Sequence, residues 1–217
     1  MGIKNQISFI HNQIGNEVCL VAVSKTKSES EIMEAYNCGQ RVFGENKVQE
    51  LVSKQNNLPN DINWHMIGHL QRNKVKYIAP FIDLIHAVDN IKLLKEINKQ
   101  AKKNNRTIDC LIQIKISNEE SKFGMEYKEV LELISSVNKS GFENINLTGF
   151  MGMASNTNNQ DILKKEFSLL NSFFKEVKQT NKNLTKISMG MSNDYQLAIE
   201  CGSNMIRVGS NIFGSRN

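Results

Sequence analysis

The feature of this sequence that most constrains its fold is the alternation of short apolar runs with longer amphipathic segments. A run that is apolar on both faces is typical of a strand in a covered parallel sheet, and apolar residues spaced three or four apart are typical of a helix. Eight such runs occur in the 217 residues. Eight strands alternating with helices predict an α/β fold, a (β/α)8 TIM barrel. A doubly wound open sheet shows the same alternation, and the count of eight favours the barrel.

The expected elements follow one another along the chain without a break. Strands are expected at about 18–23, 41–43, 62–67, 84–88, 109–116, 146–150, 186–189 and 205–208. Helices are expected between them, at about 28–39, 72–79, 91–103, 127–137, 162–180 and 194–200, with another through residues 51 and 52. An extra helix precedes the first strand, because four isoleucines from residue 3 to residue 14 are spaced four, three and four. No linker-like composition interrupts the chain, so residues 1–217 are expected to form a single domain.

Composition and charge exclude several classes of protein. Hydrophobic residues make up 40% and charged residues 23%, which is ordinary for a globular chain and excludes a disordered or collagen-like one. No apolar run approaches the roughly 20 residues of a membrane helix, and the first residues lack a signal-peptide core, so we expect a cytoplasmic protein. The net charge of +5 is compatible with anionic metabolites and too small to indicate nucleic acid. The four cysteines are scattered without a CxxC pair, which is typical of reduced thiols.

Glycine and polar residues gather where the expected strands end. These residues lie at 24–26, 44–46, 68–71, 190–194 and 207–211. In a barrel of this kind, catalytic and binding groups are carried at the C-terminal ends of the strands. Each fragment by itself is weak evidence for a functional site, but their common position predicts a site at that end of the barrel.

Lys25 is the clearest candidate for chemistry. It follows the six apolar residues 18–23, with only Ser24 between, and therefore leaves a covered strand at the mouth of the barrel. Burial there lowers the pKa of an ammonium group and supplies the neutral amine that forms a Schiff base with a carbonyl compound. The alternative is an ordinary lysine that extends from the strand end into solvent.

Two glycine–serine fragments form a second candidate. Gly190 and Ser192 follow the seventh strand, and Gly209 and Ser210 follow the eighth, where barrels recurrently bind phosphate through backbone N–H groups. Arg207 lies two residues before Gly209. Ser192 could also serve only as a helix N-cap. A lysine amine together with a phosphate site indicates an aldehyde or ketone that carries a phosphate, and both pyridoxal phosphate and a sugar phosphate of the class I aldolase type fit that description.

A resemblance to a known family distinguishes between these two ligands. Seven stretches occur in one order between residues 18 and 214: 21–27 (VAVSKTK), 43–46 (FGEN) with 49–50, 64–74 (WHMIGHLQRNK), 121–124 (SKFG), 147–151 (LTGFM), 188–194 (SMGMSND), and 207–210 (RVGS) with 212–214. In these stretches the chain resembles the pyridoxal phosphate homeostasis proteins of the YggS/PROSC type, which are similar in fold to the barrel domain of alanine racemase.

The resemblance implies a role for six residues toward pyridoxal 5'-phosphate (PLP). Lys25 would hold PLP as a Schiff base, the internal aldimine, and Arg207 would face the pyridine nitrogen. Asn46 would lie beside the cofactor ring. The phosphate would be bound by Ser192, Gly209 and Ser210. Ser210 stands where many relatives have threonine, and either hydroxyl can donate a hydrogen bond.

The same resemblance implies a carrier of the cofactor without robust turnover. An arginine donates a hydrogen bond to the pyridine nitrogen without protonating it, which leaves the ring a poorer electron sink. Racemisation needs a second base, which the related racemase takes from a tyrosine of an additional C-terminal domain. We expect that domain to be missing here, because the sequence ends at Asn217. The alternatives are a PLP-dependent amino-acid racemase of low activity and a Schiff-base aldolase.

Further expectations concern partners and histidines. The protein is expected to act as a monomer that buffers or delivers PLP in vitamin B6 homeostasis, touching PLP-dependent apo-enzymes transiently and binding neither nucleic acid nor membrane. His65 and His69 lie on a strand end and its loop with no acidic or cysteine cluster at ligand spacing, so no metal site is expected. His86 is expected to be a packed or hydrogen-bonded residue near the mouth.

Overall fold

The computed structural model describes residues 2–117, 119, 123–139 and 141–214. Eight parallel strands pair in chain order and close into a barrel. The strands are β1 (Cys19–Val23), β2 (Val42–Glu45), β3 (Asn63–Met66), β4 (Leu84–Val88), β5 (Ile108–Ile114), β6 (Ile145–Gly152), β7 (Lys186–Met191) and β8 (Met205–Val208).

The pairing of the first strand with the last decides between the two expected architectures. Cys19 of β1 pairs with Met205 of β8, and the register continues to Ala22 and Val208. An open sheet leaves its edge strands unpaired, whereas a barrel has no edges. The expected TIM barrel is therefore confirmed.

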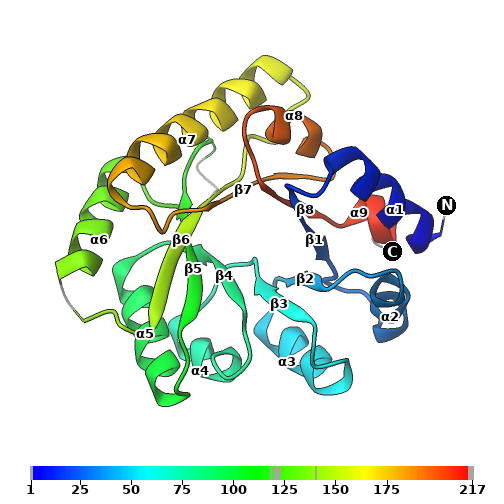
Figure 1. The fold of residues 1–217 in the computed structure, drawn as a ribbon, viewed down its shortest axis with the longest axis horizontal. Helices are drawn as coiled ribbons and strands as arrows, with labels where there is room; N and C mark the ends of the chain where they lie inside the picture. The colour runs from blue at the N-terminus through cyan, green and yellow to red at the C-terminus, as the bar shows by residue number, and fades with distance from the viewer. Residues whose placement is uncertain (1, 118, 120–122, 140, 215–217) are drawn as a thin grey trace.

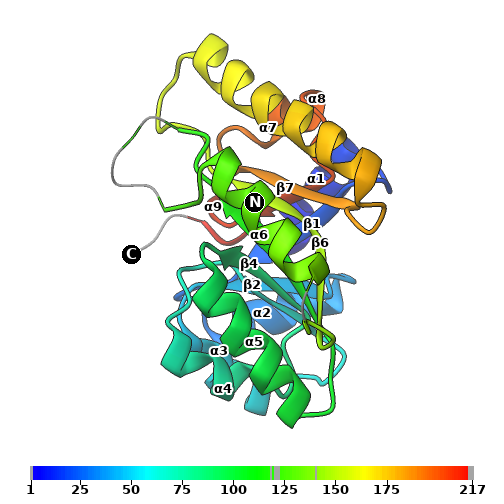
Figure 2. The same ribbon diagram turned by 90° about the vertical axis from the view of Figure 1, so that its left-hand side faces the viewer.

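Helices surround the strands, as Figure 1 shows, and α5 and α6 lie in front of the barrel in the side view of Figure 2. The expected N-terminal helix is present and packs against α2 and α9. The helices are α1 (Ile3–Ile14), α2 (Glu29–Asn37), α3 (Val48–Asn57), η1 (Arg72–Lys74), α4 (Val75–Ile78), α5 (Ile91–Lys103), α6 (Tyr127–Lys139), α7 (Gln160–Thr180), α8 (Tyr195–Glu200) and α9 (Ser210–Phe213). No helix in the described part of the chain is long and apolar enough to cross a membrane.

Two helical segments differ from expectation. The helix expected at 72–79 is a 3₁₀ turn followed by a four-residue α-helix. The four-residue helix α9 was not expected, because it is only about one turn long and periodicity needs several turns to show. Both segments are short connections at strand ends, where local bonding and not an amphipathic face determines the backbone.

The core consists of a layer between strands and helices and a smaller cluster inside the barrel. The inner cluster contains six buried apolar residues: Val21, Leu84, Ala87, Leu111, Met151 and Met205. Four buried polar residues accompany them on β3, β4, β7 and β8: His65, His86, Ser188 and Arg207. The interior of this barrel is thus unusually polar for a space that branched apolar side chains normally fill.

Candidate functional site

A cavity of about 830 Å³ opens where the C-terminal ends of the strands meet. The residues that line it come from the strand ends or loops after β1, β2, β3, β6 and β7, from β8 and the β8–α9 connection, and from helices α7 and α8. The six residues expected to bind the cofactor all line this cavity: Lys25, Asn46, Ser192, Arg207, Gly209 and Ser210. Residues as far apart as 25 and 210 in the sequence are therefore brought to one place by closure of the barrel.

Lys25 lies in a tight turn after β1, and its side chain is half-buried. The next residue, Thr26, has a φ of 65°, in the left-handed region. A β-branched residue in that region is a genuine outlier and persists only where its surroundings hold it. The turn that presents Lys25 to the cavity is therefore held by contacts outside the turn itself.

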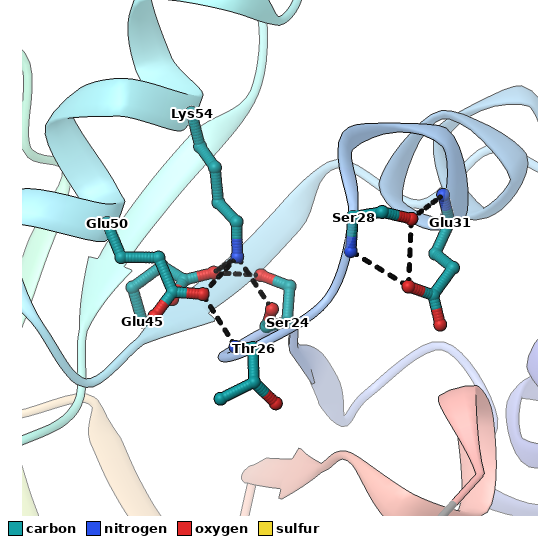
Figure 3. A network of polar contacts seen from close by, with 7 residues as sticks. All are labelled: Ser24, Thr26, Ser28, Glu31, Glu45, Glu50 and Lys54. Atoms are coloured by element: carbon teal, nitrogen blue, oxygen red, sulfur yellow. Dashed lines mark hydrogen bonds and ion pairs between the residues drawn. The ribbon is translucent and has the colours of Figure 1, made fainter. Parts of the chain in front are cut away.

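A buried cluster of ionic groups holds the turn on both sides of Lys25 (Figure 3). The ammonium of Lys54, on α3, donates to the Ser24 carbonyl at 2.8 Å and to the Glu45 and Glu50 carboxylates at 2.8 and 2.6 Å. The Glu50 carboxylate also accepts from the Thr26 N–H at 2.6 Å, and the Ser24 hydroxyl donates to Glu45 at 2.6 Å. The residue before Lys25 and the residue after it are both bonded to this cluster.

Burial makes this ionic cluster sensitive to the loss of any partner. Glu45 is fully buried and Lys54 is 5% exposed. Desolvation raises the pKa of the Glu45 carboxyl, while the hydrogen bonds from Lys54 and Ser24 oppose that rise. Leaving one member of such a cluster without its partner costs far more than the intact pair contributes. Lys54 was not anticipated from sequence, and its spacing of four from Glu50 on one helix was the available signal.

Arg207 is fixed at the wall of the cavity by two neighbouring strands, β6 and β7. Its Nη1 donates to the Ser188 carbonyl at 2.9 Å, and its Nη2 donates to the Gly152 carbonyl at 3.0 Å. Burial lowers the pKa of the guanidinium to about 10, so the group still carries its proton at neutral pH. Arg207 is thus a fixed, charged hydrogen-bond donor at the wall of the cavity.

The loops after β7 and β8 are joined to each other at the cavity. The Ser192 hydroxyl accepts from the Gly209 N–H at 3.2 Å, and the Asn211 side chain donates to the Ser192 carbonyl at 2.8 Å. Gly190 has a φ of 95°, and a Cβ there would lie 2.6 Å from the Ala198 Cβ, so only glycine fits the turn. Two hydroxyls and the amides of a loop that enters a helix form a donor set of the kind that binds phosphate.

The cavity has features that fit a flat aromatic ligand with a phosphate. The Oδ1 atom of Asn46 is buried and accepts no hydrogen bond from the described residues, and buried polar atoms normally have a partner. Val23, Ile67 and Met153 supply apolar lining on the same cavity. A ligand with polar edges and an apolar face suits these walls.

Of four methionines near the ends of β6 and β7, only two line the cavity. Met153 and Met191 do so, whereas Met151 lies in the cluster inside the barrel and Met189 in the layer under the helices. The position of all four near strand ends in the sequence suggests that they line the ligand site, and this expectation is wrong for Met151 and Met189.

Within the stretches that carry the resemblance, His69 lies away from the cavity and two further residues lie outside the described part of the chain. His69 is half-exposed, pairs with Asp89 at 3.2 Å and stacks on Phe123 with ring centroids 4.9 Å apart. It is not among the residues that line the cavity. Ser121 and Lys122, in the fourth of the stretches that carry the resemblance, lie outside the described residues.

Two fully enclosed histidines lie inside the barrel. The Nε2 atom of His86 is 3.0 Å from Nδ1 of His65, and burial lowers the pKa of both imidazoles, that of His86 well below its usual value. His86 was expected near the mouth as a packed or hydrogen-bonded residue, and it is hydrogen-bonded and completely buried. Both imidazoles are therefore neutral at neutral pH.

The free energy of unfolding is expected to fall as the pH drops below about 6.5. There the unfolded chain binds protons on His65 and His86 that the folded state does not bind, so stability rises with pH across this window. The loss is at most about 1.4 kcal/mol per pH unit for each histidine, until the pH reaches the lower folded-state pKa. Urea unfolding at several pH values measures it. A His86→Gln variant should show a shallower dependence, and an unchanged dependence in that variant would contradict the assignment.

Comparisons with known proteins agree with this geometry. The model of the family described as "Alanine racemase, N-terminal domain" matches residues 2–217. A pyridoxal phosphate homeostasis protein of Haemophilus influenzae is 39% identical over 211 residues, covering 95% of this chain and 88% of that protein. Another of that name, from Schizosaccharomyces pombe, is 39% identical over 217 residues and covers 99% of this chain and 90% of that protein.

Solved structures show the same fold. PipY of Synechococcus elongatus, solved with PLP bound, has a TM-score of 0.89 and 31% identity, covering 98% of this chain and all of that one. The same protein solved without PLP has a TM-score of 0.91. Alanine racemase from Bartonella henselae has a TM-score of 0.76 at 17% identity, covering 98% of this chain and 58% of that one, a likeness of fold alone.

Proposed function

We propose that this chain, which belongs to the family of pyridoxal phosphate homeostasis proteins within the wider alanine racemase N-terminal domain family, binds PLP and buffers or delivers it. One observation carries the proposal: Lys25, Arg207 and the two loops after β7 and β8 all meet at one cavity. The PLP-bound structure of PipY and the names of the relatives support it. Residues 1–217 act as one cofactor-binding domain in this proposal.

Each of the six residues has a stated part in holding the cofactor. Lys25 supplies the amine that holds PLP as a Schiff base, and Arg207 donates a hydrogen bond to the ring nitrogen. The partnerless Oδ1 atom of Asn46 accepts from the polar edge of the ligand. The phosphate is held by Ser192, Gly209 and Ser210. Bound PLP supplies an aldehyde and an electron sink.

Arg207 favours storage over turnover. It is held by two backbone carbonyls and keeps its proton, so it donates to the ring nitrogen and does not transfer a proton to it. Without that proton the ring withdraws electrons weakly, which slows carbanion chemistry at an attached amino acid. We propose a role without robust enzymatic turnover on this basis.

A direct assay distinguishes the carrier role from the alternative, a slow PLP-dependent amino-acid racemase. The purified protein is loaded with PLP and incubated with L-alanine and other L-amino acids, and the D-enantiomer is measured over time. We expect no accumulation above that of free PLP. Racemisation that saturates with amino acid and is lost in Lys25→Ala would establish the enzyme and contradict the carrier role.

Delivery requires the cofactor to leave the site. We propose transient contact with PLP-dependent apo-enzymes, a monomeric carrier and a cytoplasmic location. Mixing the loaded protein with an apo-enzyme should restore that enzyme's activity faster than PLP dissociates into buffer alone. Restoration no faster than this spontaneous release would argue for buffering without directed delivery.

Removing the Glu50 carboxylate is expected to weaken the hold on Lys25. In Glu50→Ala the Thr26 N–H and the Lys54 ammonium each lose an acceptor, so the strained turn relaxes. Charge-assisted hydrogen bonds contribute about 1.5–3 kcal/mol, which corresponds to a roughly tenfold or greater decrease in the rate of Schiff-base formation or in PLP affinity. The growth of the visible absorption band after PLP addition measures both.

The matched control is Glu31→Ala. The Glu31 carboxylate also accepts from a backbone N–H, that of Ser28 at 2.8 Å, and it lies 3.3 Å from the Lys27 ammonium. It caps α2 and has no bond to Ser24 or Thr26, the residues on either side of Lys25 (Figure 3). This variant should lose some thermal stability and keep the wild-type PLP affinity. Equal effects of the two substitutions on PLP binding would show that the cluster around Lys54 does not contribute specifically to holding Lys25 for PLP.

A further inference from the structure

A chain of hydrogen bonds crosses the interior of the barrel from Arg207 to Asp83. Arg207 Nη1 donates to the Ser188 hydroxyl, which is 3.2 Å from Nδ1 of His86. Nε2 of His86 is 3.0 Å from Nδ1 of His65, and Nε2 of His65 is 3.3 Å from the Asp83 carboxylate. Asp83 immediately precedes β4, so it lies at the barrel end opposite the cavity. The side chain of Asp83 is 55% exposed, so this chain of hydrogen bonds reaches solvent at that end.

The two ends of the chain determine the direction of every bond in it. The bond to His65 lowers the pKa of the Asp83 carboxyl, so Asp83 is ionised and only accepts. Neutral His65 then donates from Nε2 and accepts at Nδ1, which requires His86 to donate from Nε2. Neutral His86 accepts at Nδ1 from the Ser188 hydroxyl, whose oxygen accepts from Arg207. All four bonds point toward Asp83 without a conflict.

Filling the interior of a barrel with these polar side chains is energetically less favourable than filling it with apolar ones. Ser188 on β7 and His86 on β4 lie on strands that are not neighbours, so their bond spans the interior. Branched apolar side chains usually occupy that space, and a buried polar group is tolerated only when it is bonded. The one end of the chain that touches the cavity is Arg207.

We propose that Ser188, His86 and His65 are positioning residues that hold the Arg207 guanidinium against the ring nitrogen of the bound cofactor, with Asp83 fixing the direction of the chain from the far end. The inference rests on the proposed function, in which Arg207 faces that nitrogen. The Ser188 hydroxyl adds a third bond to those that the backbone carbonyls of Ser188 and Gly152 make with the guanidinium, and the hydrogen bonds behind it influence how strongly the guanidinium donates. Breaking the chain should therefore change the cofactor's electronic environment without removing its attachment.

The experiment compares two breaks with two matched controls. Ser188→Ala removes the hydroxyl and keeps the backbone carbonyl that binds Arg207, and Ser188→Thr restores a hydroxyl. Asp83→Ala breaks the exposed end, where folding is least at risk. Asp109→Ala is its control, because Asp109 lies at the start of β5 beside Leu84 and bonds to Lys186 and Asn146 but to no member of the chain.

Each protein is loaded with PLP, and its visible spectrum, PLP dissociation constant and melting temperature are recorded. We expect Ser188→Ala and Asp83→Ala to shift the absorption band and weaken PLP binding about three- to tenfold, a typical effect of one hydrogen bond. Ser188→Thr and Asp109→Ala should match the wild type. Borohydride should still fix the cofactor to Lys25 in all four variants, which keeps this test separate from that of the proposed function.

Three results would overturn the inference while the wild type still carries PLP on Lys25. Lower melting temperatures with wild-type spectra and affinities in Ser188→Ala and Asp83→Ala would show that the chain only stabilises the fold. Equal effects of Asp83→Ala and Asp109→Ala would indicate that bound PLP responds to the overall electrostatic field at that end of the barrel and not to the hydrogen bonds. An effect of Ser188→Ala without any effect of Asp83→Ala would show that the Ser188 hydroxyl acts on Arg207 by itself and that no connection through the histidines to Asp83 is involved. A wild type that never attaches PLP would refute the proposed function, and this inference with it.

Discussion

Lys25→Ala is expected to abolish the visible absorption band that PLP gives with the wild-type protein. The band requires a Schiff base, and alanine offers no amine at the cavity to form one. Treatment with borohydride should fix the cofactor irreversibly to the wild type and leave none on the variant. The measurement is an absorption spectrum before and after reduction, followed by gel filtration to remove unattached PLP.

Lys47→Ala is the matched control for this substitution. Lys47 is an exposed lysine next to Asn46, at the start of α3, and is not among the residues that line the cavity. It should keep the band and the borohydride-fixed cofactor. A band of wild-type intensity in Lys25→Ala would show that another lysine attaches PLP and that the turn after β1 is not the site of attachment.

Ser192→Ala combined with Ser210→Ala should cause the second large effect, a loss of affinity for the phosphate group. Each hydroxyl donates to a charged acceptor in the proposed site, and such bonds contribute about 1.5–3 kcal/mol each. The double variant should therefore bind PLP about a hundredfold or more weakly. Titration followed by absorbance measures the change.

Pyridoxal, which lacks the phosphate, is the control ligand for the double variant. Its affinity should be low for the wild type and nearly the same for the variant, because the missing hydroxyls have no phosphate to bind. The Ser192 hydroxyl also accepts from the Gly209 N–H, so a melting curve checks that the two loops remain joined. Equal losses of affinity for PLP and pyridoxal would show that the serines do not bind the phosphate.

Most of the fold could be predicted because its elements are marked by local patterns. The strand at 84–88, the helix at 91–103 and the strand at 205–208 have the predicted bounds. The helix expected at 28–39 begins at Glu29, with a capping box formed by Ser28 and Glu31. Strands β6 and β7 extend beyond the predicted bounds, to Gly152 and Met191, because backbone pairing continues through a glycine and a methionine in each strand.

The cavity could be predicted in part, because its residues follow strand ends and the barrel brings strand ends together. What supports those residues could not be predicted. The bond between Ser188 and His86 joins residues 102 apart in the sequence, and the bond between Lys54 and Ser24 joins residues 30 apart. Periodicity reports only which face of an element is buried. The usable signal was the presence of two histidines within otherwise apolar strands.

The central claim is that this barrel holds PLP on Lys25, and peptide mapping after reduction tests it most directly. The protein is loaded with PLP, treated with borohydride and digested, and the modified peptide is identified by mass spectrometry. We predict a single phosphopyridoxyl group on the peptide that contains Lys25. Modification spread over exposed lysines, or concentrated on any other lysine, would contradict the claim.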